Sequence, residues 1–570
     1  MDQVFAFRAD HHPLLAGLMD QMGMVETINT AVGEQPDNVL LDTGTMVAAM
    51  IHNLLGDGAI RLYRLGRFFA DKPLPLLFPW APHLDPSQLN DDRAGRALDT
   101  LWEVGPEKVF RAVSRLVIQR YALDLRALHA DTTSRSFYGA YDDQDPAVAQ
   151  VTYGYSKDHR PDLKQILFGV GTSRDGVPVM AEVCSGNQSD MTWNNRWIKA
   201  VRGDLGLPEG KALVYVADSA LVTTDNLEAV AEARVDFISR LPERFGLAER
   251  LMERALTVRG EWEDVGTIAE GQKAARYHLW ETDSELDERV YRFVVVHSSN
   301  LDERRLRALE REVAKEGGVL EEALAELRRQ EFVCAPDAQR AWERFVDKQS
   351  SSWHKLTGKV EKQEQRVKRA RPGRPRKDEA PKVETVYRLE AQVERDGQRY
   401  QKEQEKCGMF VLISSLRDRE EWSGREILGE YKGQPGVERI FRFIKNPAWV
   451  GAFCLKEPER IAAFGYVVLL AAMVYTLLER QVRRALAKPE EEPVEGLNRK
   501  LTHRPTSYAI QTALSAILVV GQVKRGRLGL RLSGVLSQNQ RRLLRLAGFD
   551  EGIYHWRGKT PPLNPIYQAS

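Results

Sequence analysis

The sequence predicts a mixed α/β (α+β) fold, with a helical N-terminal domain before the sheet and a large insertion within it. Three observations lead to this fold class. Apolar residues recur at helical spacing over residues 10–122. From 125 to 242 the pattern becomes three extended segments, a helix, a strand, a helix and a strand, the order of a meander completed by crossovers. Regularity is then lost until strand character returns at residue 409.

The N-terminal domain is assigned to residues 1–122 and is expected to be entirely helical. One helix has Asp42 or Thr43 as its predicted cap, and another has Pro106 at its first position, where the missing N–H is not needed. We therefore expect a small all-helical domain.

The first part of the sheet domain is assigned to residues 123–243. Its first strand alternates and is expected to end at Asp131, with a second extended piece after it. A hairpin and two short apolar runs follow. These segments are residues 125–131, 132–139, 165–171, 177–183, 211–218 and 235–242.

The insertion is assigned to residues 244–405 and is expected to be mostly β, although residues 301–332 read as a charged helix. Within it, residues 366–382 form a basic, Pro-rich linker that is too polar to pack. The second part of the sheet domain spans 406–485, and a basic C-terminal region spans 486–570.

Charge is distributed unevenly along this chain of 570 residues, whose net charge is only +1. Residues 499–549 hold ten Lys or Arg and no Asp or Glu, and residues 353–377 hold ten basic and two acidic residues. Such blocks are typical of a protein that binds a polyanion. A solvated tail or linker is the alternative for either block.

The four cysteines are scattered, which favours neither a zinc site nor a disulfide framework. The N-terminal residues show no signal peptide, so a cytoplasmic protein without a membrane partner is expected. Residues 461–478 contain no charge and just reach the length of a membrane span. We interpret them as a buried core helix, with a membrane protein as the alternative.

Two aspartates and one glutamate are the candidate metal ligands. Asp131 and Asp218 each end a predicted strand, and Glu438 lies on a predicted helix that begins at Pro435. Carboxylates held together repel unless a cation neutralises them, and Mg²⁺ prefers such oxygen ligands. A turn or helix cap is the alternative for either aspartate alone.

The helix that contains Glu438 also places Arg442 and Lys445 on the same face, at i+4 and i+7. A carboxylate flanked by cations suits a site that binds a metal and a phosphate. A surface ion pair between Glu438 and Arg442 is the ordinary alternative.

Together, ADTTS at Asp131, YVADSAL around Asp218, FISRLP, and Y-x2-Q-x3-E-x6-K from Tyr431 to Lys445 resemble a DDE transposase of the IS4 superfamily. The helical N-terminal domain and the apolar helix near residue 470 point to its IS1634-type group. The resemblance implies an RNase H-like core with a mostly β insertion before the glutamate helix.

The resemblance also implies the chemistry and the partners. Asp131, Asp218 and Glu438 would bind Mg²⁺, for which Mn²⁺ can substitute, as two ions in one active site. The substrate would be DNA, both transposon ends and target, bound by a homodimer in the synaptic complex. The protein would be bacterial and cytoplasmic, associated with the nucleoid when bound to DNA.

The family pattern is Y-x2-R-x3-E-x6-K, and Gln434 stands where the family has arginine. The resemblance assigns DNA-end contacts to Tyr431 and Lys445, with Gln434 and Arg442 as further candidates. In the linker, GRPRK resembles an AT-hook core, in which Arg374 and Arg376 would enter the minor groove. A flexible basic linker is the alternative.

The leading hypothesis is a transposase that cuts DNA at the ends of its own element and joins them to a target. The N-terminal helices are expected to recognise terminal inverted repeats, and the C-terminal basic block to bind the phosphate backbone. The alternative is a transposase-derived DNA-binding protein without catalysis.

Overall fold

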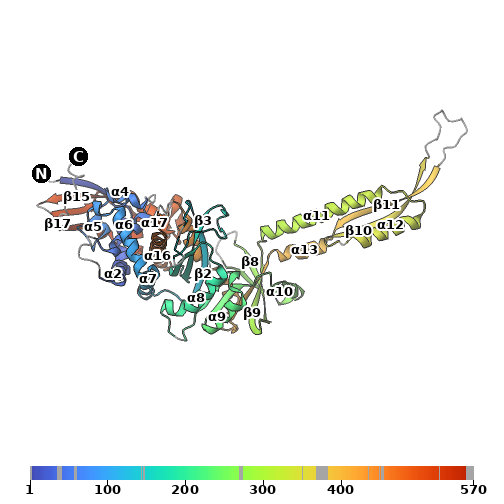
Figure 1. Ribbon diagram of the computed structural model, residues 1–570, viewed down its shortest axis with the longest axis horizontal. Coiled ribbons are helices and arrows are strands. Elements are labelled where there is room, and N and C mark those ends of the chain that lie inside the picture. Colours follow the sequence, from blue (N-terminus) through green and yellow to red (C-terminus); the bar gives the residue numbers. More distant parts are fainter. Residues whose placement is uncertain are drawn as a thin grey trace, which may run out of the picture. The chain divides into compact units, whose positions relative to one another are not determined.

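The computed structural model describes residues 3–559 except 35–40, 57–60, 143, 146–147, 209, 269–273, 350, 367–382, 434, 448–449, 451–454 and 525–526. The chain forms two compact units (Figure 1). The first unit comprises Met1–Pro242, Ser284–Arg292 and Ile413–Ser570, and the second comprises Glu243–Asp283 and Phe293–Leu412. The second unit therefore begins and ends close to the predicted insertion boundaries, 244 and 405. The division of the chain into five parts stays a prediction.

The main sheet of the first unit has the strand order β4-β3-β2-β5-β6. Strands β2, β3 and β4 are antiparallel neighbours, whereas β5 and β6 run parallel to β2. Helices α8 and α9 make the crossovers. The bounds are β2 (Ala127–Phe137), β3 (Lys164–Ser173), β4 (Pro178–Ser185), α8 (Asp190–Leu205), β5 (Val214–Ala217), α9 (Thr224–Glu232) and β6 (Asp236–Arg240). These are the strand order and directions of an RNase H-like core, and the predicted fold class is confirmed.

Strand β2 differs from its prediction. The chain does not turn after Asp131, because β2 stays paired with β3 from Leu128 opposite Ser173 to Phe137 opposite Lys164. The polar run after Asp131 suggested a break, yet Thr132, Thr133 and Ser134 are all buried. Cross-strand hydrogen bonding satisfies the backbone here whatever the side chains are. Asp131 is therefore an interior strand residue.

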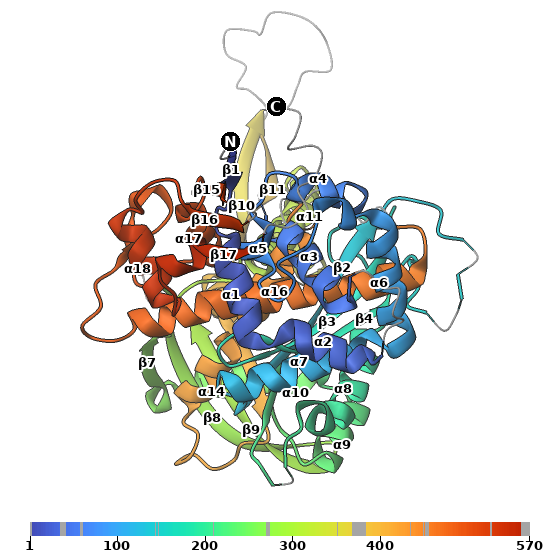
Figure 2. The same cartoon turned by 90° about the vertical axis from the view of Figure 1, so that its left-hand side faces the viewer.

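Helix α16 (Pro458–Leu486) is a central helix of the first unit. It packs against β4, α3, α6 and α7, and it runs through the middle of the view in Figure 2. At Gly465 the approach is close, since an added Cβ would lie 2.8 Å from Val183. The helix is long and apolar enough to cross a membrane, but 94% of its apolar window is buried inside the protein. The prediction of a buried core helix at residues 461–478 is confirmed, because a helix covered on several sides must be apolar all round.

The N-terminal helices follow the predicted pattern. The Asp42 carboxylate caps α3 by accepting from the Thr45 N–H at 2.7 Å, and Pro106 opens α7. The helices are α1 (His12–Met22), α2 (Met24–Val32), α3 (Thr43–Leu54), α4 (Leu65–Phe69), α5 (Leu74–Leu77), α6 (Asp91–Val104) and α7 (Pro106–Arg120).

The expectation of an entirely helical N-terminal region is wrong at its start. Residues Gln3–Arg8 form strand β1, which pairs with β15 near the C-terminus. These six residues have no neighbouring strand to pair with in the sequence. The strand forms because the distant β15 supplies its hydrogen-bond partners, so the local sequence does not predict it. The resulting sheet has the order β1-β15-β16-β17, with β15 (Leu518–Lys524), β16 (Arg527–Leu532) and β17 (Trp556–Lys559).

The first unit resumes at Ile413, near the end of strand β12 (Met409–Ser414), and continues to the C-terminal part of the chain. Strand β12 ends beside β6, where the Ser415 N–H donates to the Phe237 carbonyl at 3.3 Å. After it come α14 (Gly424–Lys432), α15 (Pro435–Lys445), β13 (Val494–Glu495), β14 (Leu501–Thr502), α17 (Ser507–Ala513) and α18 (Gln538–Leu546).

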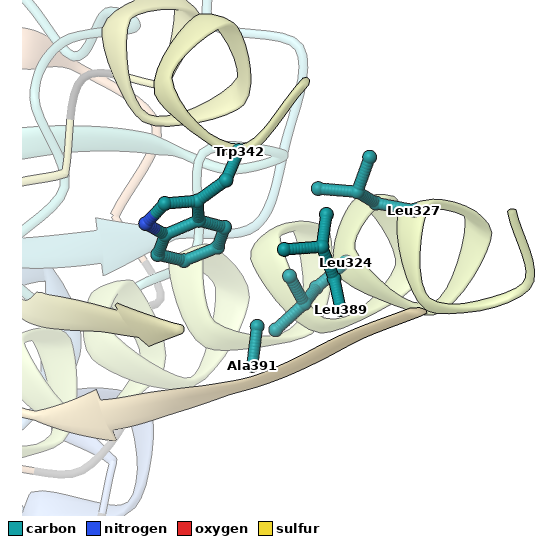
Figure 3. Packing of buried hydrophobic residues seen from close by; sticks show 5 residues of the cluster. All are labelled: Leu324, Leu327, Trp342, Leu389 and Ala391. Carbon is teal, nitrogen blue, oxygen red and sulfur yellow. The ribbon is translucent and has the colours of Figure 1, made fainter. Parts of the chain in front are cut away.

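The second unit contains more helix than strand, so the expectation of a mostly β insertion is wrong. Leu324 and Leu327 of α11, Trp342 of α12, and Leu389 and Ala391 of β11 form one of its cores (Figure 3). The helices and strands that lie wholly or partly in it are α10 (Gly246–Thr257), β7 (Glu263–Thr267), β8 (Arg276–Leu286), β9 (Arg289–Ser298), α11 (Glu303–Arg328), α12 (Ala335–Lys348), β10 (His354–Arg366), β11 (Val383–Arg395), α13 (Gly397–Lys406) and the first four residues of β12.

Half of the predicted basic block at 353–377 belongs to β10, a strand paired with β11 along its whole length. Lys359 lies 2.6 Å from Glu390, and Lys355 lies 3.2 Å from Asp396. Glu390 of β11 and Asp396, the cap of α13, therefore compensate these two lysines, which a count of charges along one segment could not show.

Candidate active site

Asp131 and Asp218 lie next to each other on adjoining parallel strands of the main sheet. In the register of β2 and β5, His129 faces Val216, and two residues further along each strand come Asp131 and Asp218. Strand β5 ends at Ala217, so Asp218 is the first residue beyond it, while β2 continues. The structure thus brings together the two aspartates that the sequence singled out.

Each aspartate also makes a local backbone contact. Asp218 caps a short 3-10 turn (Ser219–Leu221), since its Oδ1 accepts from the Ala220 N–H at 3.0 Å. Asp131 Oδ1 accepts from the Thr132 N–H at 2.7 Å. The capping alternative therefore describes part of what Asp218 does, but each carboxylate uses only one oxygen in this way.

The pair is electrostatically strained. Burial raises the pKa of Asp131 to about 6, Lys157 opposes this shift, and the charge of Asp218 adds to it. Burial also raises the pKa of Asp218, against the Ala220 N–H and Lys157. Tyr215 lies in β5, three residues before Asp218. Burial and the charges of both aspartates raise its pKa well above the usual value. Carboxylates whose charged forms are disfavoured in this way are common where a cation or substrate binds.

Lys157 is the cation at this site. Its Nζ lies 3.7 Å from Asp131 Oδ1 and 3.1 Å from Asp190 Oδ2. The same amine donates to the backbone carbonyl of Thr132 at 2.8 Å and to its hydroxyl at 2.6 Å. One ammonium group thus bridges two carboxylates, and it offsets part of their mutual repulsion.

The segment before Lys157 is held close to the main sheet. The Gln165 amide donates to the carbonyls of Tyr155 and Gly186, and the Lys157 N–H donates to the Ser134 hydroxyl at 3.0 Å. Gly154 and Gly186 touch so closely that a Cβ on Gly154 would lie 2.0 Å from the Gly186 carbonyl. Only glycine allows this approach, which places Lys157 at the aspartates.

Asp190 is a third carboxylate near the pair, and sequence reasoning missed it. It is the first residue of α8, and its Oδ1 accepts from the Thr132 hydroxyl at 2.5 Å. Its charge raises the pKa of both Asp131 and Asp218. An acid in the first turn of a helix is so common that it gave no signal in the sequence.

Tyr431 lies near the aspartates, at the end of α14. Burial raises its pKa, Arg240 lowers it, and the charges of Asp218 and Asp131 raise it. The preceding residue, Glu430, is buried, accepts from His129 Nε2 at 2.9 Å and pairs with Arg174 at 2.8 Å. These contacts anchor the end of α14 on the main sheet.

Glu438 is exposed on α15. Within the described part of the chain it forms no ion pair, so the alternative of a surface pair with Arg442 is not observed, and Arg442 is exposed as well. No group of three or more His, Cys, Asp or Glu that could hold a metal ion occurs among the described residues. The structure therefore joins Asp131 and Asp218 but not Glu438, whose role stays a prediction.

The other predicted DNA contacts have different surroundings. Lys445 pairs with Asp158, and Arg439, next to Glu438, pairs with the buried Glu479 of α16. Gln434, Arg374 and Arg376 lie outside the described residues, as does the GRPRK segment.

The C-terminal basic block is only partly uncompensated. In α18, Arg545 forms two contacts of 2.8 Å with Glu491, and Arg541 lies 2.6 Å from Glu551. Arg542 lies 3.5 Å from Glu491. Acids just outside the block thus neutralise this helix, whereas Arg527 and Arg531 of β16 form no ion pair with any acid in the described part of the chain.

The donor set of the aspartate pair fits a divalent metal. Asp131 and Asp218 supply carboxylate oxygens, the ligands that Mg²⁺ prefers, and both are only partly buried. A cation would relieve the repulsion that raises their pKa values. In chemical terms the site can bind a hard cation and, through Lys157, an anionic substrate.

Comparisons with known proteins add little beyond this geometry. A family model described as a domain of unknown function, DUF4277, matches residues 5–115, which end before β2. No curated protein matches the chain. Among solved structures, a cryo-EM structure of a piggyBac transposase synaptic complex with hairpin DNA is similar, with a TM-score of 0.34 and 9% identity over 90% of this chain and 83% of that one. A TM-score this low does not establish a shared fold, so the fold class depends on the topology of the main sheet.

Proposed function

We propose that the protein is a DDE transposase of the IS4 superfamily, in its IS1634-type group. It would bind the terminal inverted repeats of its element, cut the DNA there and transfer the 3′ ends to a target. The observation that supports this most is the position of Asp131 and Asp218, side by side on parallel strands of a sheet with RNase H-like order.

In this proposal Asp131 and Asp218 hold Mg²⁺ or Mn²⁺, two ions per active site, and Glu438 completes the ligand set. Bound metal would activate the attacking hydroxyl and stabilise the leaving oxygen of a phosphodiester. Lys157 would exchange its contacts with Asp131 and Asp190 for a substrate phosphate, because its amine is a point charge with three donors. Tyr431 would position the DNA end from the adjacent helix.

The remaining partners are part of the same proposal. Pairing two element ends implies a homodimer in the active complex, and DNA is the ligand of the basic regions. We place the protein in the cytoplasm, associated with the nucleoid when bound to DNA. Lys445, Arg442, Gln434, Arg374 and Arg376 are proposed further contacts with DNA.

The test is a cleavage assay on supercoiled plasmid that carries the element's ends, with Mg²⁺ or Mn²⁺. The parent protein is expected to nick or linearise it, and Asp131→Ala to leave it intact. Asp225→Asn is the matched control, because Asp225 is an exposed aspartate of the same unit. Equal cleavage by Asp131→Ala and the parent would refute the assignment.

One observation favours the second candidate, a DNA-binding protein without catalysis. The described residues contain no three-ligand metal group, and Glu438 is exposed. This alternative predicts specific binding of element ends but intact plasmid with every divalent metal. Cleavage that requires both Asp131 and Asp218 would exclude it.

A further inference from the structure

The two ends of the chain meet in one four-stranded antiparallel sheet, the terminal sheet, formed by β1, β15, β16 and β17. Strand β1 comes from residues 3–8, and the other three come from the last part of the chain. The pairing of β1 with β15 runs from Gln3 opposite Val523 to Arg8 opposite Leu518. The surface of this sheet is therefore formed by segments that lie more than 500 residues apart in the sequence.

One face of the terminal sheet is apolar. Val519 is fully buried, and Leu528 and Leu530 are 5% and 3% exposed. At Gly521 an added Cβ would lie 2.9 Å from Phe7, which shows how closely this face is packed. Because side chains alternate along a strand, the residues between these positions must lie on the opposite face.

The opposite face, called the basic face below, contains Arg527 and Arg531 of β16 and Arg557 of β17. The register sets Arg531 opposite Val520 of β15, and Arg557 opposite Gly529, which lies between the two arginines of β16. The same register adds Lys524, opposite Arg527, and Arg8 at the edge of β1. All five side chains are exposed.

No acidic residue occurs in any of the four strands. Arg8 is 3.3 Å from Asp10, a residue beyond the end of β1. Arg527, Arg531 and Arg557 form no ion pair or hydrogen bond with any other described side chain. This contrasts with α18, where arginines of the same basic block pair with glutamates.

The shape of the basic face suits a polymer of phosphates. Arg527 and Arg531 are four residues apart on one strand, roughly 13 Å, which corresponds to about four base-pair steps along the axis of a DNA duplex. Between them Gly529 has no atom closer than 4.0 Å to the place of a Cβ, so a phosphate can approach the backbone there. Arginine side chains bind phosphate oxygens in a bidentate manner.

We propose that the basic face binds the phosphate backbone of duplex DNA without reading its sequence. Charge complementarity identifies the partner as a polyanion, and the proposed function identifies that polyanion as DNA. The strand positions on this face hold no aromatic side chain that could stack on a base, and its exposed cations suit contact with phosphates. Its contribution is therefore affinity and orientation, separate from the recognition of terminal repeats.

The experiment measures binding of the full-length protein to a short duplex without element ends, by fluorescence anisotropy over roughly 50–200 mM NaCl. The triple variant Arg527→Gln, Arg531→Gln, Arg557→Gln is expected to bind more weakly and to lower the slope of log K against log salt by about 2.7, since each phosphate contact contributes about 0.9. A slope equal to that of the parent would overturn the proposal.

The matched control is Arg304→Gln, Arg311→Gln, Arg329→Gln, which removes three exposed arginines that lie among the glutamates of α11 and its end. Its slope is expected to equal that of the parent. The corresponding Arg→Lys triple on the basic face retains the charge and is expected to retain most of the slope. If the Lys triple loses as much as the Gln triple, backbone electrostatics is not the cause, and the proposal fails.

Two further readouts separate this proposal from its neighbours. Binding of phosphatidylserine vesicles in place of DNA by the same arginines would overturn it. Plasmid cleavage reports the proposed catalytic function independently. If Asp131→Ala cuts as well as the parent while the Gln triple shows the reduced slope, the catalytic assignment fails and the basic face stands.

Discussion

The aspartate pair and the basic face both lie on sheets of the first unit, yet their charges have opposite energetic consequences. Asp131 and Asp218 are partly buried and close together, so each charge raises the free energy of the folded state, and their pKa values are raised. Arg527, Arg531 and Arg557 are exposed to water, which screens them, so the fold tolerates an acid-free surface. In the proposed function the first region is the catalytic one, and the second region contributes affinity alone.

The largest expected effect comes from removing a charge of the aspartate pair. Asp218→Asn keeps the size of the side chain and can still accept from the Ala220 N–H, but it loses a metal ligand. We expect plasmid cleavage to fall by on the order of 10³-fold or more, while binding to element ends changes little. Asp225→Asn serves as the control here too, and cleavage by Asp218→Asn at the rate of the parent would remove this region from catalysis.

Glu438→Gln tests whether the pair is part of a larger site. If Glu438 joins Asp131 and Asp218 when DNA and metal bind, cleavage falls nearly as far as in Asp218→Asn. Glu459→Gln is a suitable control, because it changes an acid in the first turn of another helix. Normal cleavage by Glu438→Gln would show that the exposed position of Glu438 persists in the active complex.

The cost of the buried charge predicts an intermediate effect on stability. The pKa of Asp131 is about 6 in the folded protein and about 3.8 when unfolded, so between these values only the folded state holds the proton. The free energy of unfolding therefore falls as the pH rises from about 4 to 6, and this loss persists at higher pH. Without metal, Asp131→Asn is expected to be more stable than the parent by about 1 kcal/mol at pH 8, because it removes the buried charge. The gain is no larger because partial exposure of Asp131 screens that charge.

Chemical denaturation in EDTA at pH 8 and pH 4 measures this difference. The advantage of Asp131→Asn is expected to disappear at pH 4, where the parent is also protonated in its folded state. In contrast, Arg531→Gln on the basic face is expected to leave stability unchanged at both values. A less stable Asp131→Asn at pH 8 would mean that Lys157 fully compensates the carboxylate.

The smallest expected effect is that of a single arginine of the basic face. Arg557→Gln removes one phosphate contact, so the salt slope for duplex DNA is expected to fall by about 0.9, and cleavage at saturating DNA to remain normal. Arg329→Gln is the single-site control. A large loss of cleavage by Arg557→Gln would show that the two regions are not independent.

Much of the fold could be predicted because its signals are local. Asp42 before α3 and Pro106 at the start of α7 mark helix ends by their own chemistry, and the uncharged run in α16 indicates a helix covered on all sides. The predictions of structure fail where pairing between distant segments decides whether a segment becomes a strand. The polar residues after Asp131 resemble a turn but pair with β3. Lys359 of β10 belongs to a block expected to bind a polyanion, but it pairs with Glu390 of β11.

The sequence by itself determined which two aspartates form the pair, because each of them follows a segment with the pattern of a β-strand. Only the tertiary structure decided what surrounds them: Lys157 from a loop and Asp190 from a helix start, each held by contacts with β2. It likewise decided that Arg8 and Arg557 share one face with Arg527 and Arg531. The physical reason is that strand register is a non-local property, and a shift of a strand by one residue would turn its arginines to the other face of the terminal sheet.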